Sequence, residues 1–122
     1  MNKALLSTIA IGALCIPFAS AKAFAKEVRV YSGRHYNTDR EVFKAFSQST
    51  GIKVRLIEAT GISLVERLKR EGAKSQADVI LLVDAARINN AANAGLLTPI
   101  QSSLLNKEVP KQYRDPNNRW FG

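Results

Sequence analysis

Length, composition and charge limit this chain to one modest domain. Its 122 residues suffice for a single domain, and its one cysteine, Cys15, rules out an internal disulfide framework. The formal net charge of +8 raises the question of a nucleic-acid partner, but the Lys and Arg residues are scattered along the chain. Because no basic run with interleaved aromatic residues appears, we expect a solvated basic surface and no nucleic-acid partner.

Residues 1–25 have the pattern of a cleavable signal peptide. A positive start at Lys3 is followed by an apolar run over residues 4–18, and Ala23-Phe24-Ala25 fits a small-x-small cleavage site. The run is short for a membrane anchor, and Leu14 before Cys15 does not suit lipid attachment. We therefore predict cleavage after Ala25, export to the periplasm, and a mature chain over residues 26–122 that lacks cysteine.

Three strand-then-helix units are expected after the signal peptide. Alternating apolar residues predict strands over residues 27–33 and 52–58, and the unbroken apolar run over residues 77–83 predicts a strand covered on both faces. Capping boxes that begin at Thr38 and Ser63 predict helix starts, while Gly51 and Gly72 suit helix ends. A third helix is expected over residues 85–94, before Gly95.

These units predict an α/β fold with a parallel sheet. Right-handed crossovers place the three strands in the order second, first, third, with the third strand buried inside the sheet. The pattern weakens after Pro99, and Trp120-Phe121 is interpreted as the beginning of a further strand. We expect the sheet to be incomplete, so residues 26–122 form a truncated lobe.

Candidate chemistry lies in the loops that follow the strands, where open α/β sheets bind ligands. These loops span residues 32–37, 58–61 and 84–87, and the first holds the only histidine, His35, beside Tyr36. No nucleophile elbow or phosphate-binding glycine loop appears, so we predict no enzymatic activity. Fe³⁺ is a hard cation that favours charged oxygen donors and accepts imidazole, and a bound cation drives the proton from a phenol.

The segment VYSGRHYNTDREVFKAFSQSTGIKVRLIEATG, with ADVILLVD further along, resembles the periplasmic ferric-iron-binding proteins of ABC importers. RHYNTD in particular is similar to the tyrosine-rich branch of these bacterial counterparts of transferrin. The resemblance implies the amino-terminal lobe of a type II periplasmic solute-binding fold. It also implies that His35 and Tyr36 are Fe³⁺ ligands, that the protein is a monomer, and that it delivers iron to an inner-membrane ABC permease.

The chain departs from the family pattern in two places. Other members carry a glutamate ligand at the end of the third strand, where this chain has Val83 followed by Asp84, and we expect Asp84 to cap the third helix. The family's adjacent tyrosine pair belongs to a second lobe, and Tyr31 and Tyr113 do not match it. Two alternatives remain: a solute-binding protein for an anion attracted by Arg34 and Arg87, and an exported α/β hydrolase fragment.

Overall fold

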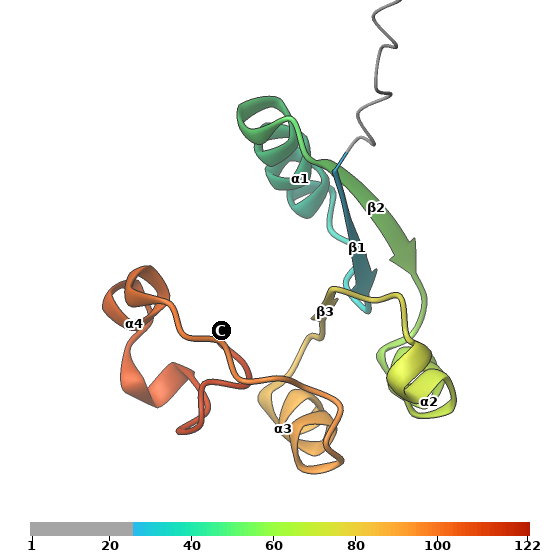
Figure 1. Ribbon diagram of the computed structural model, residues 1–122, viewed down its shortest axis with the longest axis vertical. Helices are drawn as coiled ribbons and strands as arrows, with labels where there is room; N and C mark the ends of the chain where they lie inside the picture. The colour runs from blue at the N-terminus through green and yellow to red at the C-terminus, as the bar shows by residue number, and fades with distance from the viewer. Residues whose placement is uncertain (1–25) are drawn as a thin grey trace, which may run out of the picture.

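The computed structural model describes residues 26–122, so the predicted signal peptide lies outside the described residues. The elements alternate as predicted over most of the chain, and Figure 1 shows their arrangement. They are β1 (Glu27–Ser32), α1 (Asn37–Thr50), β2 (Lys53–Glu58), α2 (Gly61–Glu71), a 3₁₀ turn (Gly72–Lys74), β3 (Val79–Leu81), α3 (Ala85–Asn93), α4 (Ser103–Glu108) and a second 3₁₀ turn (Lys111–Tyr113).

The sheet is parallel and has the predicted order β2-β1-β3. β1 pairs with β2 along its whole length, from Glu27 opposite Lys53 to Ser32 opposite Glu58. The chain leaves β1 in one direction to form β2 and returns past β1 to form β3. Right-handed crossovers therefore place α1 and α2 on opposite faces of the sheet. Both crossovers bring a strand-to-helix loop to the same carboxyl edge.

The buried core lies between β1 and α2. Tyr31, Leu64 and Leu68 form one cluster, and partly buried Ile57 and Ile80 pack against it. Removal of these apolar surfaces from water stabilises the fold, at about 25 cal/mol per Å² of apolar surface buried. α2 is thus fixed to the sheet by the same strand that leads into the candidate loop.

Two helix starts differ from prediction. α1 begins at Asn37, after Tyr36, whose side chain makes no capping hydrogen bond, so Thr38 lies inside the helix. α2 begins at Gly61 because the hydroxyl of Thr60 accepts a hydrogen bond from the Ser63 backbone N–H at 3.2 Å. The predicted helix end at Gly51 is confirmed, with a left-handed φ of 70°.

The prediction of a buried third strand is wrong for the described residues. β3 has three residues and lies at the sheet edge, where Val79 remains 41% exposed. The prediction failed because an apolar run encodes a strand that can be covered on both faces, while the cover itself depends on other elements. Nothing within residues 26–122 pairs with the outer edge of β3.

The carboxyl-terminal segment is held by a bridge and by a buried ion pair. Phe121 forms an isolated antiparallel bridge with Arg114, and the further strand expected from Trp120-Phe121 stays a prediction. Asp115, 2% exposed, accepts hydrogen bonds from Nε and Nη2 of Arg119, each at 2.8 Å. These bonds lower the pKa of Asp115 to about 2. Nη1 of Arg119 donates to the Ala92 carbonyl at 3.1 Å, which fixes this segment against α3.

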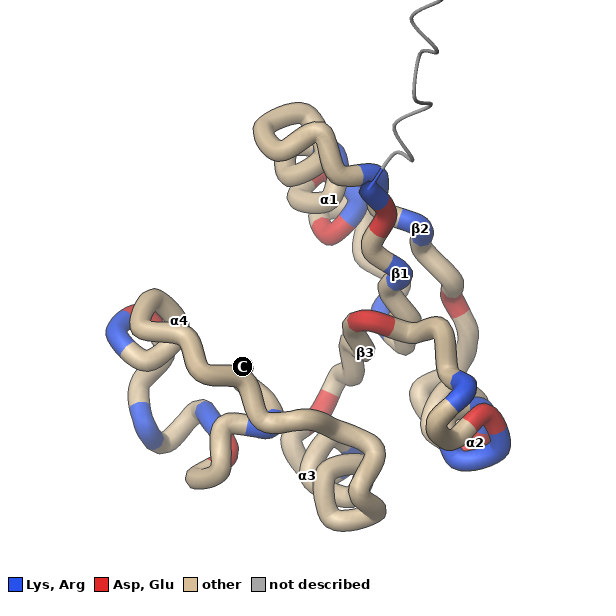
Figure 2. The backbone as a smooth tube through the Cα atoms, viewed as in Figure 1, with Lys and Arg blue, Asp and Glu red and all other residues tan. Residues whose placement is uncertain are grey.

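Charged residues are spread over the elements. Figure 2 shows Lys and Arg along the strands and on several helices, without concentration on one element. Among residues 26–122, no helix combines the length and apolar character that a membrane crossing requires.

Candidate functional site

The loop between β1 and α1 is held firmly at its base. Ser32 is 1% exposed, and its hydroxyl both donates to the Arg34 carbonyl at 2.9 Å and accepts from the Arg34 N–H at 3.1 Å. The Gly33 N–H donates to the Leu81 carbonyl of β3 at 2.8 Å. These bonds fix the backbone just before His35, so the loop emerges at a defined place on the carboxyl edge.

A close backbone approach explains the glycine at position 33. A Cβ atom at Gly33 would lie 3.0 Å from Gly61 Cα and 3.1 Å from Gly61 N, at the start of α2. Real Cβ atoms are rarely this close to a backbone, so a side chain here would push two loops apart. The first two strand-end loops are therefore in direct contact.

His35 lies on the exposed part of this loop beside the end of β2. Its side chain is 62% exposed, and its Nδ1 lies 3.7 Å from Oε1 of Glu58. The other carboxylate oxygen of Glu58 pairs with the guanidinium of Arg40, in the first turn of α1. Glu58 thus contacts both the predicted ligand loop and the helix that follows it.

Tyr36 is also accessible, at 55% exposure. The guanidinium of Arg34 lies over its ring, 5.2 Å from the centroid, within the range of cation–π attraction. Arg34 forms an ion pair with Asp39 at 3.0 Å. The charge beside the phenol is therefore balanced by a carboxylate of the same segment.

The other tyrosines have different environments. Tyr31 is 1% exposed, and its hydroxyl donates to both oxygens of Glu71 at 3.1 and 3.2 Å. Burial, followed by this hydrogen bonding, raises the pKa of Tyr31. Tyr113 is exposed in the second 3₁₀ turn, near the carboxyl terminus. Tyr31 is thus a structural side chain that holds α2 to β1.

The residues around position 84 behave as expected. Oδ1 of Asp84 accepts a hydrogen bond from the Arg87 N–H at 2.6 Å, so Asp84 caps α3. Val83 is 53% exposed and offers no donor atom. The guanidinium of Arg87 lies 3.7 Å from the Asp84 carboxylate. Since Arg34 is also paired, each arginine of the anion-binding alternative has a neighbouring carboxylate.

The donors present define what this edge can do. His35 offers an imidazole nitrogen and Tyr36 a phenol oxygen, a set that suits a hard trivalent cation. In the described part of the chain, no three or more His, Cys, Asp and Glu side chains gather into a metal-binding group. Ligation by His35 and Tyr36 stays a prediction, and this pair leaves coordination positions for donors from elsewhere.

Glu58 begins the second of the predicted strand-end loops, residues 58–61, but no role was predicted for it. It ends β2 and stands opposite Ser32 in the parallel register. That register confirms the predicted place of this loop beside the His35 loop, because a parallel partner of the last β1 residue must lie at the same edge.

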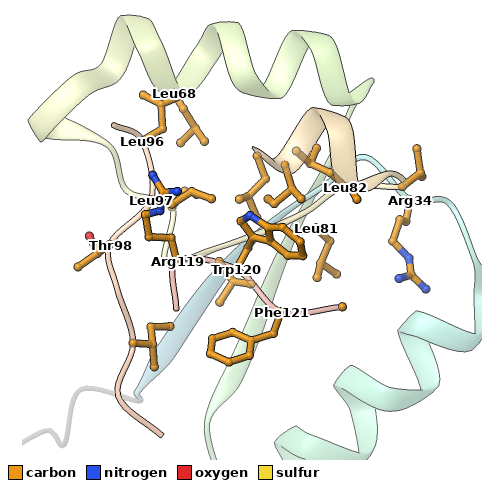
Figure 3. A pocket seen from close by; sticks show the side chains of 18 of the residues that line it. Arg34, Leu68, Leu81, Leu82, Leu96, Leu97, Thr98, Arg119, Trp120 and Phe121 are labelled. Carbon is orange, nitrogen blue, oxygen red and sulfur yellow. The ribbon is translucent and has the colours of Figure 1, made fainter. Parts of the chain in front are cut away.

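A separate apolar hollow lies on the outer side of β3. It has a volume of about 550 Å³ and is lined by β3, the start of α3, residues 96–98 and the chain end. Figure 3 shows Trp120 and Phe121 beside Leu81 and Leu82, with Arg34 apart from them. Neither His35 nor Tyr36 lines the hollow, but Arg34, whose guanidinium lies over the Tyr36 ring, does.

Comparison with known proteins identifies the relatives of the chain. Residues 32–122 match the family described as bacterial extracellular solute-binding protein. Iron uptake protein A1 of Synechocystis is 47% identical over 87% of this chain and 29% of its own length. The major ferric iron-binding protein of Neisseria gonorrhoeae is 32% identical over 83% of this chain and 31% of its own length.

The same relationship appears in solved structures. The structure of Trichodesmium IdiA (FutA) in complex with iron and citrate ligands is 49% identical, with a TM-score of 0.76 over 79% of this chain. The alignment covers 30% of that protein, so the chain spans about a third of the length of the relatives it matches. The expected fold class, part of a type II periplasmic solute-binding protein, is confirmed.

Proposed function

Because the chain belongs to the family of bacterial extracellular solute-binding proteins, we propose that it provides the amino-terminal part of an Fe³⁺-binding component of an iron import system. The single observation that carries the proposal is the loop after β1, which presents His35 and Tyr36 together at the carboxyl edge of the sheet, both exposed. The ferric-binding and iron-uptake names of the relatives support the cargo.

The mechanism follows from donor chemistry. Imidazole binds as the neutral ring and the phenol binds as phenolate, so uptake of Fe³⁺ releases protons. The balanced pairs Arg34–Asp39 and Arg40–Glu58 keep local positive charge from repelling the ion. Two donors from one exposed edge hold iron weakly, and tight capture requires further oxygen donors on the opposite side of the ion.

Export and delivery complete the proposal. Residues 1–25 direct the chain across the inner membrane and are removed after Ala25, and the mature protein delivers iron to an inner-membrane ABC permease as a monomer. Expression in a bacterium followed by amino-terminal sequencing tests the first step. A mature protein that begins at Lys26 supports it, and retention of residues 1–25 contradicts it.

Iron titration tests the site itself. Addition of ferric nitrilotriacetate to the purified protein should produce the visible charge-transfer absorption of an iron–phenolate bond. The double substitution His35→Ala, Tyr36→Phe should abolish this band, whereas Tyr113→Phe, at an exposed tyrosine outside the site, should leave it unchanged. An undiminished band in the double variant would refute the assignment.

A further inference from the structure

We propose that Glu58 is a positioning residue for His35, which holds the imidazole so that its Nε2 faces the iron. The inference rests on the proposed function and deepens it. In this proposal Glu58 is not an iron ligand. It acts on the imidazole of His35, whose Nδ1 lies 3.7 Å from Oε1 of Glu58.

The sheet register places the carboxylate. Glu58 is the last residue of β2 and stands opposite Ser32, the last residue of β1. Along β2 its side chain points to the same face as Val54 and Leu56, which together with Phe43 of α1 line a small hollow. The carboxylate therefore rises on the α1 face of the sheet, where the loop that carries His35 passes.

Each oxygen of the carboxylate has its own neighbour. Arg40 of α1 pairs with Oε2, which anchors Glu58 from the helix side and turns Oε1 toward His35. Glu58 is more enclosed than its partners, with 27% of its side chain exposed against 62% for His35 and 59% for Arg40. The carboxylate is thus the more enclosed of the pair, and the imidazole has more room to rotate.

The chemistry of histidine ligands gives this contact its meaning. A metal-bound imidazole usually donates its other N–H to a carboxylate, carbonyl or water, and this partner fixes the tautomer and the ring orientation. At 3.7 Å the Nδ1–Oε1 contact is longer than a hydrogen bond. A rotation of the exposed His35 side chain brings the two atoms within hydrogen-bond distance, in the iron-free protein as well as when iron binds Nε2.

The tautomer of His35 can be measured before any iron is added. His35 is the only histidine of the chain, so imidazole carbon and nitrogen chemical shifts report on it without ambiguity. At a pH where the ring is neutral, the fraction protonated at Nδ1 should be larger in the wild-type protein than in Glu58→Leu. A matched control, Glu66→Leu, removes an equal charge from an exposed site on α2 and should leave this fraction unchanged.

Iron affinity then tests the positioning role. Titration with ferric nitrilotriacetate, followed at the iron–phenolate band, should show binding about 10–100-fold weaker in Glu58→Leu than in the wild type or Glu66→Leu. Glu58→Gln, which keeps an oxygen acceptor without the charge, should fall between them. Circular dichroism spectra that match the wild type establish that the variants are folded.

Two results would overturn the inference: an unchanged tautomer fraction in Glu58→Leu, or equal iron affinities of Glu58→Leu and Glu66→Leu. A wild-type protein that binds no iron would instead refute the proposed function. In that case the tautomer measurement alone decides whether Glu58 orients His35.

Discussion

Replacement of Tyr31 by phenylalanine should separate a tyrosine that holds the fold from Tyr36, which is predicted to bind iron. The hydroxyl of Tyr31 is buried and donates to Glu71 at 3.1 and 3.2 Å. Glu71 keeps two other partners, Arg67 and Ser75, so the substitution leaves no isolated charge. The Arg67 guanidinium, 4.7 Å from the ring centroid, can remain over a phenylalanine.

The expected loss is therefore that of one hydrogen bond to a charged acceptor. We expect Tyr31→Phe to lower the free energy of unfolding by about 1–2 kcal/mol and the Tm by roughly 5–15 °C. Iron binding should be unchanged below the Tm. Tyr36→Phe should show the opposite pattern, because Tyr36 is 55% exposed and no hydrogen bond of its side chain is found among the described residues.

Thermal unfolding followed by circular dichroism, together with ferric nitrilotriacetate titration, measures both properties on the same samples. The reasoning is refuted if Tyr31→Phe unfolds at the wild-type temperature. It is equally refuted if Tyr31→Phe loses iron at a temperature where its spectrum is native.

Three further predictions concern the core, the chain end and the loop contact. Leu64→Ala, at 1% exposure, should cost about 2–4 kcal/mol in urea unfolding, while Ile62→Ala, at 66% exposure on the same helix, should change stability by less than about 0.5 kcal/mol. Asp115 has a pKa lowered from 3.8 to about 2, so its contribution is present above pH 3.8 and is lost as pH falls toward 2. Asp115→Asn should therefore be less stable at neutral pH and should show a flatter pH dependence below pH 4 in urea unfolding; an unaltered acid profile would count against this. Gly33→Ala should lower stability by about 1–3 kcal/mol, since its Cβ would meet the Gly61 backbone, and a wild-type Tm would disprove that contact.

The sequence predicts the sheet well where local pattern decides the outcome. The alternation of apolar and polar residues along β1 and β2, and the left-handed φ of Gly51, depend only on residues that are neighbours in the sequence. The start of α2 was misplaced because Thr60 and Ser63 both suit a helix cap, and only the path of the chain selects Thr60.

The extent of β3 depends on more distant structure. An apolar run at residues 77–83 shows that the segment can be buried, but pairing ends at Leu81, whose partner Ser32 is the last residue of β1. The strand pattern predicted that the loops of His35 and Glu58 meet at one edge of the sheet, but it did not predict their contact. The two are far apart along the chain, and the contact arises from the register of β1 against β2.

The hollow beside β3 contains a natural optical reporter. Trp120 is the only tryptophan of the chain, and its indole nitrogen is buried without a hydrogen-bond partner among the described residues. The wavelength of indole emission shifts with the polarity around the ring. The intrinsic fluorescence of this protein is therefore sensitive to changes in the hollow that Trp120 lines. The iron–phenolate absorption predicted for Tyr36 would be read at visible wavelengths, apart from this emission.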